Sequence, residues 1–121
     1  MKNVKVLIND GPLLTSLRSM LEPLGLRIDT PEINVRLADD DFSETVMIIL
    51  DPVLGADGVV HELIDTLKSR SATSRIPILL CSNEANHEVL IRGLGMGATD
   101  FILLPASPRS VMEAIKRHLH L

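Results

Sequence analysis

Aromatic residues are almost absent from this 121-residue chain, which has two phenylalanines and no tryptophan or tyrosine. A folded core must therefore be built from aliphatic side chains. Hydrophobic residues make up 45% of the chain and charged residues 23%, a balance that excludes general disorder. Because a chain of this length suits one compact domain, we predict a single domain over residues 1–121.

Cysteine and positive charge are also scarce. The single cysteine, Cys81, excludes an internal disulfide and a multi-cysteine metal site. Twelve Lys and Arg against sixteen Asp and Glu give a net charge of −4, which argues against a nucleic-acid-binding module and a polybasic membrane anchor. No apolar run approaches the roughly 20 residues of a membrane span, and the start of the chain shows no signal peptide. We therefore expect a cytoplasmic protein that binds neither nucleic acid nor membrane.

Five short apolar segments predict β-strands. Four of them are nearly continuous and rich in β-branched residues, which is typical of a parallel sheet covered on both faces. The predicted strands span residues 4–8, 26–28, 46–50, 76–81 and 101–104.

Amphipathic segments between these strands predict helices. Pro12 and Pro108 suit first helical turns, and Ser107 suits an N-cap. Glycines at 93, 95 and 97 predict that the fourth helix is short and easily moved. Regular alternation of strands and helices indicates a parallel sheet with helices on both faces. The predicted helices span residues 12–22, 35–42, 58–69, 86–95 and 108–119.

Polar side chains follow the predicted strands at their carboxyl ends, where sites lie in open α/β sheets. Asp10 follows the first strand, Asp51 the third and Ser82 the fourth. Two carboxylates suit Mg²⁺, which prefers oxygen ligands and binds through one or two carboxylates. The acids also suit a structural interpretation, in which Asp10 caps the helix at Pro12 and Asp51 occupies a turn before Pro52.

In their order and spacing, these motifs resemble the receiver domain of two-component response regulators over essentially the whole chain. Residues 6–10 resemble the first strand and its acidic pair, and residues 48–51 resemble the strand that ends in the phosphoacceptor aspartate. Residues 77–82 resemble the strand that ends in the switch hydroxyl. Residues 97–101, followed by Leu104-Pro105, resemble the family's glycine–alanine–x–x–aromatic and lysine–proline signatures.

The resemblance implies a flavodoxin-like (βα)5 fold, a three-layer sandwich with a five-stranded parallel sheet in the order 2-1-3-4-5. It implies that Asp51 is the phosphoacceptor, Ser82 the switch hydroxyl and Phe101 the switch aromatic. It also implies a cis peptide bond between Leu104 and Pro105.

The resemblance implies one cofactor, Mg²⁺. Its ligands would be Asp10, Asp51, the backbone carbonyl of Val53 and, through a water, Asn9. Because Asn9 stands where the family has the first acid of its pair, it brings no charge, and we expect a weak metal site. No other cofactor is expected.

Leu104 is the most consequential departure from the family, since it stands where the family has its lysine. Phosphorylation adds roughly −1.5 to −2 charge, which that lysine pairs with. Breaking one side of a desolvated charge pair typically costs ~3–5 kcal/mol. The loop over residues 51–58 is also one residue shorter than is usual.

These departures predict a degenerate receiver domain that acts as a protein–protein interaction module with weak or no phosphorylation of Asp51. We expect a protein partner on the face from Val89 to Leu119 and no enzymatic activity beyond autocatalytic phosphotransfer to Asp51. A histidine kinase is one candidate partner, and a second copy of the chain, paired through the last helix, is another. The five predicted βα units account for the given residues, so no DNA-binding helix-turn-helix is predicted among them. Two alternatives stay open: a phosphorylation-competent receiver that accepts a phosphoryl group from a histidine kinase with Mg²⁺, and a small-ligand sensor at the strand-end rim.

Overall fold

A single parallel sheet forms the centre of the computed structural model, which describes residues 1–34, 36–55 and 58–119. Its strands lie in the order β2-β1-β3-β4-β5, as predicted. All five predicted strands are confirmed, with ends that differ from the prediction by at most two residues. They are β1 (Asn3–Leu7), β2 (Arg27–Asp29), β3 (Thr45–Leu50), β4 (Ile78–Asn83) and β5 (Asp100–Leu104).

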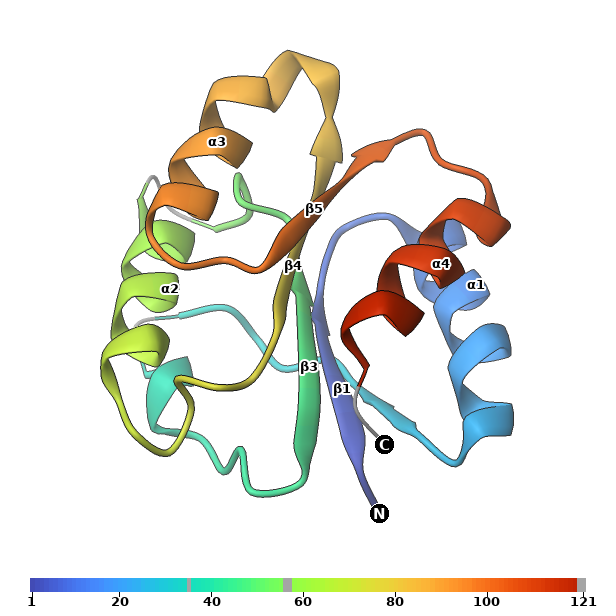
Figure 1. Ribbon diagram of the computed structural model, residues 1–121, viewed down its shortest axis with the longest axis horizontal. Helices are drawn as coiled ribbons and strands as arrows, with labels where there is room; N and C mark the ends of the chain where they lie inside the picture. The colour runs from blue at the N-terminus through green and yellow to red at the C-terminus, as the bar shows by residue number, and fades with distance from the viewer. Residues whose placement is uncertain (35, 56–57, 120–121) are drawn as a thin grey trace.

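Helices cover both faces of this sheet. Figure 1 shows α1 and α4 on one side and α2 and α3 on the other. Asp10 caps α1 and Ser107 caps α4, each accepting a hydrogen bond from a backbone N–H three residues further on. The α-helices are α1 (Gly11–Leu21), α2 (Val59–Ser69), α3 (His87–Gly95) and α4 (Pro108–His118), and the 3₁₀ turns are η1 (Glu22–Leu24), η2 (Leu37–Asp39) and η3 (Glu84–Asn86).

The prediction of an α-helix over residues 35–42 is wrong. The described part of this segment holds only the turn η2, and Val35 lies outside the described residues. Three consecutive aspartates, 39–41, would have placed negative charge at the carboxyl end of the helix, where the helix dipole disfavours it. One of the five predicted βα units therefore lacks its helix.

A partly buried ion pair joins β1 and β2. Lys5 of β1 is 5% exposed, and its Nζ lies 2.7 Å from Oδ2 of Asp29, its direct neighbour in β2. The Phe42 ring covers the ammonium at 5.2 Å from Nζ to the ring centroid. Phe42 thus covers the cation of a matched charge pair.

Two aliphatic clusters fill the space between the sheet and its helices. One packs β1, β3 and β4 against α1 and α4, and the other packs them against α2, α3 and η2. Cys81 belongs to the first cluster, and burial, reinforced by the charge of Asp51, raises the pKa of its thiol to about 12. Within the described ranges, no helix is long and apolar enough to cross a membrane.

Candidate functional site

An open cleft of about 650 Å³ lies at the carboxyl ends of the strands. It brings together residues that follow β1, β3, β4 and β5 in the chain. Neither Lys nor Arg occurs among the lining residues that the structure describes. The lining consists of Asn9, Asp10, Gly11, Pro12, Asp51, Val53, Ser82, Asn83, Asn86, Leu104 and Pro105.

Asp51 lies directly after β3, in a turn that fixes its carboxylate. Its backbone N–H donates to the carbonyl of Leu7 at 3.0 Å, which extends the pairing of β3 with β1. Its Oδ1 accepts a hydrogen bond from the N–H of Val53 at 3.0 Å, and its backbone carbonyl accepts one from Leu54 at 3.1 Å. The turn interpretation of Asp51 is therefore confirmed, and it leaves Oδ2 as a second carboxylate oxygen for a ligand.

Asp10 supplies the other carboxylate of the cleft and also caps α1. Its Oδ1 accepts a hydrogen bond from the N–H of Leu13 at 2.9 Å. The predicted capping role is confirmed. Since capping and ligand binding can use different oxygens of one carboxylate, the cap does not remove Asp10 from the cleft chemistry.

Ser82 ends the buried part of β4 and is 3% exposed. Its Oγ accepts a hydrogen bond from Nδ2 of Asn86 at 2.7 Å. Asn83 also lines the cleft, and its Oδ1 accepts from the N–H of Ala85 at 3.0 Å. The functional predictions from sequence missed both asparagines, because an asparagine before a helix predicts a cap and carries no other signal.

Leu104 lines the cleft and packs, half-buried, against the core cluster under α1 and α4. Its peptide bond to Pro105 is cis, as predicted. Phe101 instead packs against the cluster on the α2 and α3 side and is not among the cleft-lining residues. The structure thus brings six of the seven predicted site residues together and places Phe101 apart. The six are Asn9, Asp10, Asp51, Val53, Ser82 and Leu104.

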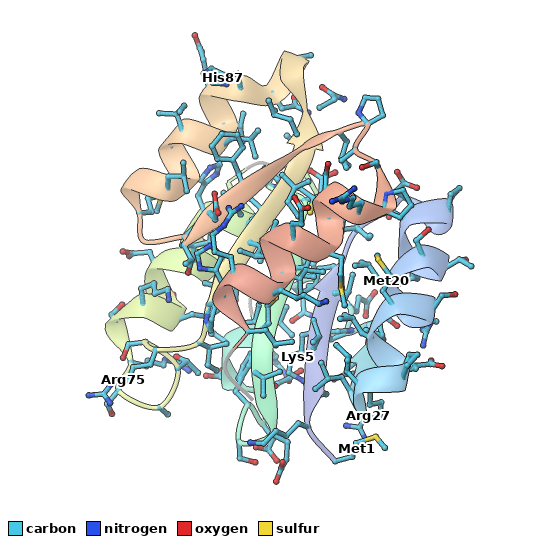
Figure 2. The ribbon with its side chains drawn as sticks, turned by 45° about the vertical axis from the view of Figure 1, so that its right-hand side comes forward. Met1, Lys5, Met20, Arg27, Arg75 and His87 are labelled. Carbon is cyan, nitrogen blue, oxygen red and sulfur yellow. The ribbon has the colours of Figure 1, made fainter. Side chains whose placement is uncertain are left out.

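A second hollow of about 240 Å³ lies between α1 and α4 and adjoins the cleft. The two hollows share Asp10, Pro12, Leu104 and Pro105. Most of the remaining lining of the second hollow is apolar and includes Met20, which Figure 2 shows on α1. Leu104 therefore lies at the boundary between the polar cleft and the mostly apolar hollow and brings no charge to either.

The two aspartates are the only ionisable side chains in the described lining of the cleft, so its formal charge is −2. No group of three or more His, Cys, Asp or Glu side chains placed to hold a metal occurs in the described part of the chain. A metal ion in the cleft would therefore depend on carbonyl, amide and water oxygens as well as on carboxylates, a donor set that suits Mg²⁺.

Comparison with known proteins relates this architecture to a family, although no family model matches the chain. The phosphate regulon transcriptional regulatory protein PhoB of Rhizobium meliloti (strain 1021) is 31% identical over 121 residues, which cover 96% of this chain and 51% of that protein. The chain thus spans about half the length of this relative.

Solved structures agree in fold with this chain over nearly its whole length. The signal receiver domain of a histidine kinase from Syntrophus aciditrophicus has a TM-score of 0.75 at 26% identity, over 98% of this chain and 90% of that one. The receiver domain of the sensor histidine kinase PA1611 from Pseudomonas aeruginosa PAO1, which holds a magnesium ion in its active site cleft, has a TM-score of 0.71 at 18% identity, over 97% and 96% of the two chains. With the strand order and the sequence relative, these likenesses identify the family: the chain is a receiver domain of two-component response regulators.

Proposed function

We propose that this receiver domain is degenerate: Asp51 accepts a phosphoryl group poorly or not at all, and the domain signals by binding a protein partner in a fixed conformation. The observation that carries the proposal is the absence of Lys and Arg from the described lining of the cleft, where Leu104 takes the position of the family's lysine.

The charge of the cleft supports this proposal. Asp10 and Asp51 already give a formal charge of −2, and a phosphoryl group would add roughly −1.5 to −2 more. Leu104 offers that group no hydrogen-bond donor and no charge. The side chains of Asn83 and Asn86 carry amide N–H donors that could hydrogen-bond the phosphoryl oxygens, but they bring no positive charge to offset the added negative charge. The modified state therefore lacks the interaction that would stabilise it.

Magnesium would bind this cleft weakly. Asp10, Asp51, the carbonyl of Val53 and a water on Asn9 are the proposed ligands, by analogy with a magnesium site in a structurally similar receiver domain. Both carboxylates already accept a backbone hydrogen bond through Oδ1, which lowers their availability to a metal. When bound, the ion would offset part of the negative charge. It would not take the place of the lysine that the family has at the position of Leu104 in β5.

The 89–119 face, which comprises α3, β5 and α4, is the proposed binding surface for a partner. Two large apolar side chains are exposed there, Ile91 at 50% and Leu103 at 40%. The same face exposes basic residues, Arg92 and Lys116, and acidic residues, Glu88 and Glu113. A protein surface with an apolar centre and a rim of both charges would complement it. A histidine kinase and a second copy of the chain are the candidate partners.

Intact-mass spectrometry after incubation with a small-molecule phosphodonor and Mg²⁺ tests the proposal. We expect no stoichiometric adduct of about 80 Da, the mass of one phosphoryl group. The matched control is Asp51→Asn, which removes the acceptor. A stoichiometric adduct that is lost in Asp51→Asn would overturn the proposal in favour of the alternative, a phosphorylation-competent receiver.

A small-ligand sensor is the second candidate function, favoured by the hollow between α1 and α4 that joins the cleft at Leu104. Its ligand would combine a polar group near Asp10 with an apolar part against Met20. A thermal-shift screen of such compounds tests this candidate. Binding that Leu104→Lys abolishes would support it, and no stabilisation by any compound would argue against it.

A further inference from the structure

We propose that Asn86 is a positioning residue: it holds the Ser82 hydroxyl in place and, through that hydroxyl, fixes the start of α3 to the end of β4. The inference rests on the proposed function in one respect, because it names the contact that keeps the binding face in a fixed conformation. Asn86 is not part of any motif by which the chain resembles its family.

The hydrogen bond between the two side chains is short and shielded. Asn86 Nδ2 donates to Ser82 Oγ at 2.7 Å, Ser82 is 3% exposed, and Asn86 is half-buried. A hydrogen bond in such a site competes little with water, and leaving a buried hydroxyl without its donor carries a desolvation penalty. The two residues therefore constrain each other.

Asn86 makes this bond instead of capping its own helix. It occupies the N-cap of α3, where asparagine is among the most favourable residues, yet its side chain accepts no hydrogen bond from the helix backbone. The N-caps of α1 and α4, Asp10 and Ser107, both do. The Asn86 side chain is thus committed to β4, and the first turn of α3 has no side-chain cap.

Two contacts then tie α3 to the same face of β4. Leu80 and Ser82 are two residues apart in the strand, so their side chains point to the same side of the sheet. Gly93 packs closely on Leu80, whose Cδ1 would lie 2.5 Å from a Cβ at position 93. Asn86 bonds Ser82 about two helical turns earlier. The apolar contact fixes the second half of α3 and the polar contact fixes its start.

A third contact comes from the neighbouring helix. His61 of α2 is buried, and its Nε2 lies 3.2 Å from the carbonyl of Val89 in α3. This contact supports the helix from the side and does not reach the cleft. The Ser82–Asn86 bond, by contrast, joins two cleft-lining residues, one at the end of the strand and one at the start of the helix.

Amide hydrogen exchange measured by NMR on the full chain, without metal or phosphodonor, tests the inference. In Asn86→Ala and in Ser82→Ala we expect exchange in the first two turns of α3 to accelerate by about three- to tenfold. The double variant should exchange no faster than the more affected single variant, because both substitutions remove the same bond. Ser82→Thr keeps the hydroxyl and should restore the wild-type rates.

The side-chain amide signals of Asn86 provide a second readout that a general loss of stability does not move. They should shift in Ser82→Ala and return toward the wild-type position in Ser82→Thr. Thr73→Val is the matched control, since it removes another buried hydroxyl, which donates to the carbonyl of Leu67 at 2.6 Å far from the cleft. It should affect α3 no more than α4.

Accelerations that multiply in the double variant, or unchanged Asn86 amide signals in Ser82→Ala, would overturn the inference while leaving the proposed function intact. A phosphoryl adduct on Asp51 would do the reverse. The two proposals therefore fail in separate experiments.

Discussion

The two ends of the sheet differ in whether a cationic side chain is present. At the carboxyl end, which His87 marks in Figure 2, two aspartates line a cleft without a cationic side chain among its described residues. At the amino end, near Arg75 in Figure 2, the Lys68 ammonium donates to the carbonyls of Ser74 at 3.1 Å and Ile76 at 2.8 Å. The chain thus places a half-buried cation where it stabilises a turn.

The chain does contain lysines with partners inside the fold, but they lie away from the cleft. Lys68 is half-buried over Gly97, where an added Cβ would lie 2.8 Å from its Cγ. Burial lowers the pKa of Lys68, so its carbonyl partners hold a charge that the site would otherwise disfavour. Lys5 is likewise matched, by Asp29. Lys5 and Lys68 thus have charged or carbonyl partners inside the fold, whereas the two cleft aspartates have no cationic partner among the described lining residues.

Moving a cation to the carboxyl end should give the largest effect. We expect Leu104→Lys to raise the rate of phosphodonor-dependent adduct formation on Asp51 by about 100-fold, equivalent to roughly 3 kcal/mol of restored pairing. Time-resolved intact-mass measurement gives the rate. Leu104→Met, which changes the shape and adds no charge, should leave it at the wild-type level. An equal rise in both variants would show that the missing charge is not the cause.

Unpairing the cation inside the sheet should give the next largest effect. Asp29→Asn leaves the Lys5 ammonium, whose side chain is 6% exposed, without its anion. Because the Asp29 side chain is 38% exposed and water can enter, we expect a loss of about 2–3 kcal/mol in the free energy of unfolding by urea. Adding Lys5→Met should recover part of the loss. Full stability in Asp29→Asn would show that the pair is not a matched buried charge.

Removing the amino-end cation should cost less. Lys68→Met keeps most of the packing on Gly97 but loses both carbonyl hydrogen bonds, so we expect a loss of about 1–2 kcal/mol in the free energy of unfolding. The lowered pKa of Lys68 means that the unfolded chain binds more protons at alkaline pH, so wild-type stability gains a positive slope as the pH rises toward 10.5. Urea titrations across that range should show the slope in wild type and not in Lys68→Met.

The smallest effect concerns the surface charges of the 89–119 face. Burial alone would raise the pKa of Asp100, but hydrogen bonds from the His118 side chain and the Phe101 N–H, with the charge of His118, hold it below 3.8. Its contribution is therefore present above that pH and is lost as the pH falls through the lower folded-state value. Asp100→Asn should lower the free energy of unfolding by roughly 0.5–1 kcal/mol near neutral pH and by progressively less as the pH falls below 3.8.

The exposed Asp40→Asn is the control for that measurement. Urea unfolding of both variants at neutral and acidic pH checks the prediction. A difference between Asp100→Asn and wild type that persists at the acidic end would assign the effect to something other than the carboxylate charge.

The sheet and the cleft could be predicted because their signals are local. Apolar runs fix the strands, parallel strands gather their carboxyl ends on one rim, and a residue directly after a strand must lie there, which placed Asp10, Asp51 and Ser82 correctly. The position of Leu104 in the cleft followed from the same rule.

Features that depend on competition between partners could not be predicted. The side chain of Asn86 bonds a serine in place of its own helix, and the segment around η2 forms a 3₁₀ turn because three aspartates oppose an α-helix. His118 meets Asp100 at 2.9 Å only because α4 returns alongside β5. In each case the structure depends on which of two available contacts is stronger. The periodicity of apolar residues in the sequence does not contain that information.

Strand β2 has a consequence for how copies of this chain meet. It forms one border of the sheet and spans only Arg27–Asp29, with a charged residue at each end. A border of three residues offers an approaching chain few free amide and carbonyl groups, and its charges discourage strand addition and fibre growth on that side. Copies that associate beside β2 must therefore do so through side chains, since a continuous intermolecular ladder has almost no template there.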